Sequence, residues 1–198
     1  MIVGLTGGLA SGKDLVATYL KEFGAVIIDA DKIAREIIEP GEEAYSEIVS
    51  IFGDKVVRKD GRIDRAALGE IVFSDRALLN KLNDIMLPRI IEEEKRRIGA
   101  VQKNNRGATI VINAPLLIES GHYRDMERVI VVDIDEQLQI ERAGQKGYTR
   151  ETARARMKSQ ITREKRLSHA DFIIDNSGNR QTTRDRTSKV FAELRKAT

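Results

Sequence analysis

The sequence predicts an α/β fold in which a parallel β-sheet is covered by helices on both faces. Short apolar segments with strand character alternate with segments of helical periodicity along the 198-residue chain. Strands that are apolar on both faces are typical of parallel sheets buried between helical layers. In addition, a glycine-rich loop lies between the first apolar segment and the first helical one, where parallel sheets commonly bind ligands.

The first half of the chain is predicted to alternate strand and helix before a long helical stretch. Residues 2–5 form the first strand, and the helix after the loop ends near Phe23. Residues 25–28 form a second, fully apolar strand, followed by a helix to about Ile38. Pro40-Gly41 ends that helix. Residues 42–103 are then mostly helical. The features expected there are a turn at Asp60-Gly61, helix N-caps at Asp64 and Ser74, and a kink or interruption at Pro88.

The second half is predicted to supply three more strands and several short helices. The strands are expected at residues 109–112, 129–132 and 172–174. A helix is expected to follow Asp135, and Thr149 and Thr162 are candidate N-caps of two further helices. Residues 180–196 are predicted to form the last helix, because Val190, Phe191 and Leu194 make an apolar face.

The loop from Gly7 to Lys13 has the spacing Gly-x4-Gly-Lys of a phosphate-binding loop, or P-loop. Backbone N–H groups in such a loop converge on phosphate oxygens, where larger side chains would obstruct them. The helix that follows adds the positive end of its dipole. Lys13 is expected to reach the terminal phosphates of a nucleotide. An ordinary glycine-rich turn with an exposed lysine is the alternative, and the position between strand and helix disfavours it.

Composition argues against several classes of protein. The chain has no cysteine, which excludes disulfides and thiolate metal sites, and its two histidines are too isolated to suggest a zinc site. No apolar run is long enough to span a membrane, and a strand begins at the N-terminus in place of a signal peptide. A cytoplasmic location is therefore expected. The absence of tryptophan and the few aromatic residues argue against a base-stacking nucleic-acid surface.

Positive charge is concentrated in one block of the sequence. Residues 142–166 contain nine Lys or Arg and two Glu, a balance of +7 against +3 for the whole chain. Such a block binds nucleic acid, clamps the phosphates of a small ligand, or forms a solvated helix face. The phosphate-binding loop elsewhere in the chain favours a phosphate clamp.

A set of short motifs resembles the dephospho-CoA kinase family. They follow one another in that family's order and spacing, from the first residue to about Gly178. The motifs are Gly4-Leu5-Thr6-Gly7-Gly8, Ile28-Asp29-Ala30-Asp31, Ala34-Arg35-Glu36, Pro40-Gly41, Asp60-Gly61-Arg62-Ile63-Asp64-Arg65, Pro115-Leu116-Leu117 with Glu119, Ala170-Asp171 and Ile174-Asp175-Asn176.

The resemblance implies a P-loop NTPase-type parallel sheet flanked by helices, with a helical substrate-side insert and a helical lid. The core would comprise residues 1–30, 104–136 and 170–198, the CoA subdomain residues 31–103, and the basic lid residues 137–169. The implied enzyme transfers the γ-phosphoryl group of ATP to the ribose 3′-hydroxyl of dephospho-CoA, the last step of coenzyme A synthesis. Mg²⁺ is the implied cofactor, and ATP and dephospho-CoA are the partners, with no nucleic acid and no membrane. The oligomeric state is unknown.

Individual roles follow from the same resemblance. Asp31 would accept or orient the proton of the ribose hydroxyl, Lys13 would hold the phosphates, and lid residue Arg142 would reach the transferred phosphoryl group. Helix capping is an alternative role for Asp29 and Asp31. ATP is expected to bind Gly8, Leu9, Ala10, Ser11, Gly12, Lys13, Asp14 and Leu15, with Asn176 at the adenine unless it is only a turn residue. The substrate is expected at Asp29, Asp31, Arg35 and Leu116, the last of which shapes the cleft.

The chain departs from the family's pattern at four positions. Asp14 and Leu15 follow Gly12-Lys13, where the family usually has Ser or Thr and then Thr. Asp14 is the candidate Mg²⁺ ligand, because a carboxylate is also a hard oxygen ligand. Leu87 stands in place of a usual His, and Lys146 lies near a common second lid arginine. Two alternatives therefore stay open: a catalytically impaired relative that binds nucleotide, and a P-loop kinase with another small-molecule substrate.

Overall fold

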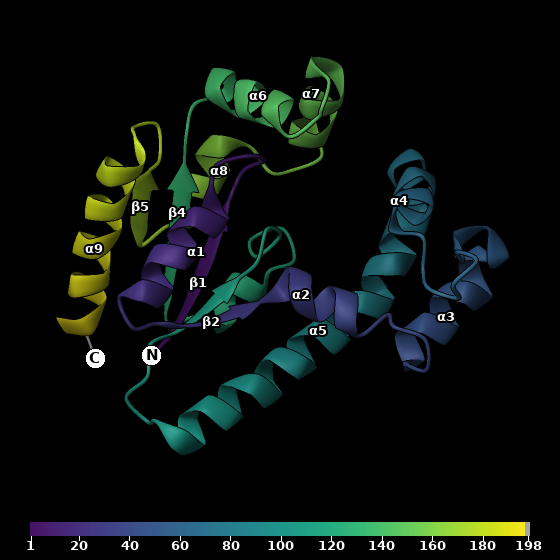
Figure 1. Cartoon of the computed structure of the whole chain (residues 1–198), viewed down its shortest axis with the longest axis horizontal. Helices are drawn as coiled ribbons and strands as arrows, with labels where there is room; N and C mark the ends of the chain where they lie inside the picture. The colour runs from purple at the N-terminus through teal and green to yellow at the C-terminus, as the bar shows by residue number, and fades with distance from the viewer. Residues whose placement is uncertain (197–198) are drawn as a thin grey trace. The chain divides into compact units, whose positions relative to one another are not determined.

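The computed structural model describes residues 1–196, apart from the side chain of Phe73. One sheet of five parallel strands has the order β2-β3-β1-β4-β5. All five predicted strands are present, and the predicted parallel sheet is confirmed (Figure 1). The strands are β1 (Ile2–Gly7), β2 (Val26–Asp29), β3 (Ile110–Asn113), β4 (Arg128–Asp133) and β5 (Phe172–Asp175).

Two helices cover one face of this sheet. They are α1 (Lys13–Glu22), which follows the glycine-rich loop, and α9 (Arg180–Lys196), the last helix of the chain (Figure 1). Leu20 and Leu194 are fully buried in the same core cluster as the strand residues Val3 and Leu5. Removing this apolar surface from water holds the first helix, and with it the loop, against the sheet.

The other face of β1 packs closely on the segment that follows β3. A Cβ atom on Gly4 would lie 2.4 Å from Cδ2 of Leu117, so a larger residue at position 4 would displace that side chain. Leu117 is 1% exposed. This packing gives Leu117, the last residue of the Pro115-Leu116-Leu117 motif, a structural role. The segment then passes through the 3-10 helix η2 (His122–Asp125) into β4.

Three short helices follow β4, and the second and third begin at the predicted caps Thr149 and Thr162. Asp135, Thr149 and Thr162 accept bonds from backbone N–H groups three residues ahead, at 2.8, 3.1 and 3.2 Å respectively. Figure 1 shows α6 and α7 beyond the carboxyl end of β4. The helices are α6 (Glu136–Gln145), α7 (Arg150–Lys158) and α8 (Arg163–Leu167).

The chain divides into two compact units, and the second is entirely helical. The first unit comprises Met1–Asp29 with Ala100–Thr198, and the second comprises Ala30–Gly99. Ile48 and Phe52 belong to a separate core cluster in the second unit. Its elements are α2 (Ala30–Glu36), α3 (Glu43–Phe52), the 3-10 helix η1 (Asp54–Val56), α4 (Arg65–Ser74) and most of α5 (Arg76–Asn104).

In that unit the Asp64 cap is confirmed, the Ser74 cap is corrected, and of the two outcomes expected at Pro88 an interruption is excluded. Ser74 does not begin a helix but is the last residue of α4, where its hydroxyl donates to the carbonyl of Ile71 at 2.9 Å. Asp75 provides the cap instead, accepting from the N–H of Ala77 at 2.8 Å. Pro88 does not interrupt α5, which continues through it. None of the described helices is both long enough and apolar enough to cross a bilayer.

Candidate functional site

Two glycines of the loop between β1 and α1 lie where a side chain would be strained or would displace a neighbour. Gly12 has a φ of 86°, in the left-handed region that other residues rarely adopt. A Cβ on Gly8 would lie 2.3 Å from Nε2 of Gln139, so the end of that side chain would have to shift. A turn bond from the N–H of Ser11 to the carbonyl of Gly8, 3.1 Å long, closes the loop. At both ends of the loop, Gly8 and Gly12 therefore leave the backbone without a side chain.

Asn176, in the turn after β5, fastens this loop to the rest of the core. Its Nδ2 donates to the carbonyl of Ser11 at 2.7 Å, and its Oδ1 accepts from the hydroxyl of Thr183 at 2.6 Å. The residue is 3% exposed. A Cβ on Gly12 would lie only 2.1 Å from the same Nδ2. Both polar atoms of Asn176 are thus used in positioning the loop.

Lys13 is almost completely buried and is held by two side chains. Its Nζ donates to Oδ1 of Asn113 at 2.6 Å and to Oδ1 of Asp14 at 3.0 Å. The amide Nδ2 of Asn113 in turn lies 3.2 Å from Asp14 and 3.4 Å from Oδ2 of Asp29. Asn113 is the centre of this network, although the sequence analysis assigned it no individual role. The available signal is that Asn113 ends a predicted buried strand, where parallel sheets place functional side chains.

Asp14 carries a negative charge beside this lysine. Partial burial by itself raises the pKa of the Asp14 carboxyl, but the Lys13 ammonium and the Asn113 amide outweigh it and hold the pKa below its usual range. The side chain is 78% exposed. Its carboxylate is therefore ionised and open to solvent at neutral pH.

The oxygen atoms in this network fit a hard divalent cation that arrives with a nucleotide. Asp14 and Asp29 supply carboxylates on either side of Asn113. Mg²⁺ typically uses one or two carboxylates and completes its octahedral shell with substrate phosphates and water. Within residues 1–196, no cluster of three or more His, Cys, Asp or Glu is arranged to hold a metal by itself. The protein ligands thus suit a metal site that phosphate oxygens complete.

Arg142 lies at the Gly12 end of the loop. Its Nη1 is 3.9 Å from the position that a Cβ on Gly12 would take. Arg142 also lines a cavity of about 460 Å³ together with Leu15 and Asn176. Four of the sequence-predicted ATP residues therefore line one cavity together with Arg142; they are Ala10, Gly12, Leu15 and Asn176. Lys146, the position of the expected second lid arginine, lines it as well.

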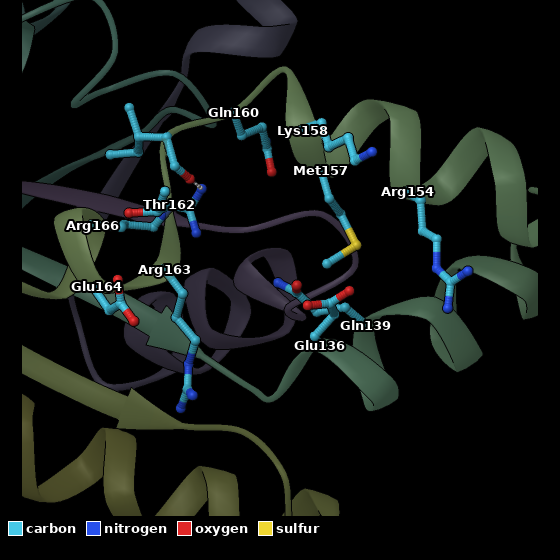
Figure 2. A pocket seen from close by; sticks show the side chains of 11 residues that line it. Glu136, Gln139, Arg154, Met157, Lys158, Gln160, Thr162, Arg163, Glu164 and Arg166 are labelled. Carbon is cyan, nitrogen blue, oxygen red and sulfur yellow. Dashed lines mark hydrogen bonds between the residues drawn. The ribbon is translucent and has the colours of Figure 1, made fainter.

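A second cavity, of about 810 Å³, lies among α6, α7 and α8 near the Gly8 end of the loop. Gln160 and Arg166 line it, and Figure 2 shows them with Arg154 from α7 around the same space. Oε1 of Gln160 accepts from the N–H of Leu9 at 3.0 Å. Nη1 of Arg166 is 3.1 Å from the position of a Cβ on Gly8. Sequence reasoning found the basic block but did not select these two residues from it.

The remaining predicted residues are distributed over both units. Asp31 is in the first turn of α2, two residues after Asp29, and Arg35 is in the last turn of the same helix. Both are exposed. Leu116 belongs to the first unit and is 44% exposed, although its neighbour Leu117 is buried.

Comparisons with known proteins agree on one family. Residues 1–182 match the model of the family described as dephospho-CoA kinase. A dephospho-CoA kinase of Thermobifida fusca is 45% identical over 195 residues, which cover 98% of this chain and 96% of the relative. A solved dephospho-CoA kinase from Campylobacter jejuni is 32% identical with a TM-score of 0.73, covering 99% and 98% of the two chains. A solved Thermus thermophilus protein, 28% identical, has a TM-score of 0.82 and covers 98% and 97%.

Proposed function

The chain belongs to the dephospho-CoA kinase family, and we propose from this premise which of its residues bind ATP and which activate the acceptor. The protein is an ATP-dependent kinase that transfers the γ-phosphoryl group to the 3′-hydroxyl of dephospho-CoA, the last step of coenzyme A synthesis. The loop around Lys13 holds the triphosphate. Asp31 takes the hydroxyl proton.

The reaction forms one bond and breaks one bond at phosphorus. The ribose 3′-oxygen bonds to the γ-phosphorus while the bond to the β–γ bridging oxygen breaks, which leaves ADP. The proton of the 3′-hydroxyl passes to the carboxylate of Asp31, or is oriented by it. Because phosphoryl transfer depends mainly on positioning and charge neutralisation, the fixed donors of the loop supply most of the protein's contribution.

Lys13 is the main protein cation that neutralises the charge of the phosphates, and Asn113 positions its ammonium group. A rigid ammonium costs little reorganisation when the charge on the phosphates shifts in the transition state. Asp14 would hold Mg²⁺ together with phosphate oxygens, and that ion would supply further neutralisation. Arg142 and Leu15 would contact the nucleotide at the Gly12 end. The oxygen-rich surroundings of Lys13 support this assignment.

We further propose that residues 31–103 bind the acceptor and that residues 137–169 act as the lid. Asp29, Arg35 and Leu116 would contact dephospho-CoA. The helical character of the first segment and the high positive charge of the second support this division of labour.

The observation that carries the proposal is the held ammonium of Lys13 beside a bare glycine loop. The test is a coupled ADP-release assay with Mg-ATP and dephospho-CoA, with ³¹P NMR to locate the new phosphate. Asp31→Asn should reduce kcat by about 100-fold or more while ATP affinity stays within twofold, because it removes the proton acceptor alone. Asp75→Asn is the matched control, since Asn caps a helix as well as Asp does.

Each outcome of that assay is informative. Full turnover by Asp31→Asn would contradict the role of Asp31. ATP binding without turnover would support the alternative of a catalytically impaired relative, which the charge of Asp14 beside the loop makes worth testing. Turnover with shikimate or a nucleoside monophosphate in place of dephospho-CoA would favour another small-molecule kinase.

A further inference from the structure

Arg166 is a buried cation placed against the phosphate-binding loop. It lies in α8 and is 5% exposed. Its Nη1 is close enough to Gly8 that a Cβ on that glycine would lie 3.1 Å away. A charged side chain with this degree of burial is rare unless protein or ligand groups compensate it.

The protein compensates this charge only in part. Nη2 donates to the carbonyl of Ile161 at 3.1 Å. The nearest carboxylate oxygen, Oε1 of Glu119, is 3.8 Å away, which is too long for a hydrogen bond. Among the described residues, Nε of Arg166 and Oε2 of Glu119 are buried without a hydrogen-bond partner. Burial lowers the pKa of the Arg166 guanidinium, although Glu119 and Asp133 act in the opposite direction.

The loop beside Arg166 already has an acceptor oxygen in contact with its backbone. Oε1 of Gln160 accepts from the N–H of Leu9, a position where an anionic oxygen would accept in the same way. Arg166 and Gln160 also line the cavity of about 810 Å³ shown in Figure 2. There is thus space next to an undercompensated guanidinium and next to a backbone donor whose present acceptor, Gln160, lines the same cavity.

The two ends of the loop differ in what surrounds them. The Gly12 end faces the smaller cavity, with Asn176 and Leu15, where the adenine was expected. A triphosphate that runs along the loop from that end would place its last phosphate near Gly8 and Leu9. Arg142 lies at the Gly12 end of the loop, and Arg166 lies at the Gly8 end.

We propose that Arg166 binds the terminal phosphoryl group of the nucleoside triphosphate at the Gly8–Leu9 end of the loop, and that Glu119 positions it. This inference rests on the proposed function, since it assigns a further residue to the same nucleotide site. It moves the role expected of Arg142 to Arg166. It also gives a function to Glu119, which the family motif contains but the phosphate loop alone does not explain.

The test compares nucleotides of different length bound to the full chain. Equilibrium affinities for Mg-ATP, ADP and AMP are measured by calorimetry without dephospho-CoA. Arg166→Met should weaken ATP binding by about 10- to 100-fold, as expected for loss of charged hydrogen bonds, and AMP binding by less than twofold. Arg166→Lys should recover part of the loss, since it keeps the charge but not the planar fork.

Arg163→Met is the matched control from the same helix and cavity. Arg163 is committed to Asp133, with bonds of 2.8 and 2.5 Å, so its loss should leave the ratio of ATP to AMP affinity within twofold. Glu119→Gln should lower that ratio less than Arg166→Met does. The double variant should be no worse than Arg166→Met alone, because Glu119 acts through the arginine.

An unchanged ATP-to-AMP ratio in Arg166→Met would overturn the inference. An equal loss of ATP and AMP affinity would also overturn it, because it would indicate a general structural role. If the wild-type protein binds ATP with the expected preference but releases no ADP with dephospho-CoA, the proposed function fails while the assignment of Arg166 stands.

Discussion

Lys13 and Asn113 are one hundred positions apart in the chain, yet the ammonium of the first donates to Oδ1 of the second at 2.6 Å. The contact is made because β3, which Asn113 ends, pairs directly with β1, which leads into the loop. Sheet pairing thus brings a neutral acceptor under the loop's lysine. A neutral partner fixes the ammonium without cancelling its charge.

Replacing Asn113 by Ala should impair both folding and nucleotide binding. The buried Lys13 would lose its shortest hydrogen bond, at a cost of about 1–3 kcal/mol in the free energy of unfolding. We expect kcat/KM for ATP to fall by about tenfold or more, because the ammonium is no longer held. Asn104→Ala, at an exposed position near the end of α5, is the control. Chemical denaturation and ADP-release kinetics measure the two effects, and wild-type values for both would contradict the role of Asn113.

Contiguous features of the structure were predictable from the sequence, and features that depend on packing were not. The loop from Gly7 to Lys13 can be recognised without knowing the sheet order, and Thr149 and Thr162 cap their helices as predicted. Ser74 and Asp75 are adjacent and both are good caps. Which one begins α5 depends on where α4 ends, and the local pattern does not determine that.

The same reasoning explains why some site residues had no predicted role. Asn113 joins the site only because β3 lies between β2 and β1 in the sheet. Arg166 is one of nine basic residues between 142 and 166, and charge does not distinguish it from the others. Burial distinguishes Arg166 from the other basic residues, but burial depends on tertiary packing and is not visible in the sequence. Asn176 was selected for the adenine, whereas its side-chain bonds to Ser11 and Thr183 could not be read from the sequence.

Restoring the family's hydroxyl residues should raise activity. Asp14→Ser with Leu15→Thr removes a negative charge near the triphosphate and releases Lys13 from a 3.0 Å ion pair. We expect ATP affinity in the presence of EDTA to rise by about 3- to 10-fold, and turnover with Mg-ATP to rise as well. Leu15→Thr alone separates the two changes. Equal, high turnover in the wild type and the double variant would show that Asp14 does not reduce the activity of the enzyme.

The effect of Asp14 on metal-free ATP binding should not change with pH in the neutral range. The pKa of its carboxyl lies below the usual value of 3.8, so the group remains charged above that pH and is protonated only in stronger acid. The affinity difference between wild type and Asp14→Ser should therefore be constant from about pH 7.5 to pH 9, a range in which the terminal phosphate of ATP also keeps its charge. Calorimetric titrations at three pH values check this. A difference that disappears at about pH 7.5 would indicate a raised pKa instead.

Gly12→Ala should abolish tight ATP binding for two separable reasons. The left-handed backbone at a φ of 86° costs about 1–2 kcal/mol for alanine, and the new methyl group would meet Nδ2 of Asn176 at 2.1 Å. Gly147→Ala is a matched control, because its φ is 88° and nothing lies within 4 Å of the added atom. Both variants should lose similar stability from strain. Only Gly12→Ala should lose at least about tenfold in ATP affinity, and equal affinities would show that the Asn176 contact is unimportant.

The helical unit should lose part of its stability in acid through Glu93. Hydrogen bonds from Arg96, together with Arg97, lower the pKa of Glu93 to about 2 from an ordinary 4.5. A depressed pKa means that the stabilisation is complete above pH 4.5 and is lost as pH falls toward 2. Glu93→Gln should therefore lower Tm by about 2–4 °C at pH 7, and the difference should vanish near pH 2. Glu92→Gln, at an exposed position with no ion pair among the described residues, is the control. A Tm difference that persists unchanged at pH 2 would mean that Glu93 acts through packing, not through its charge.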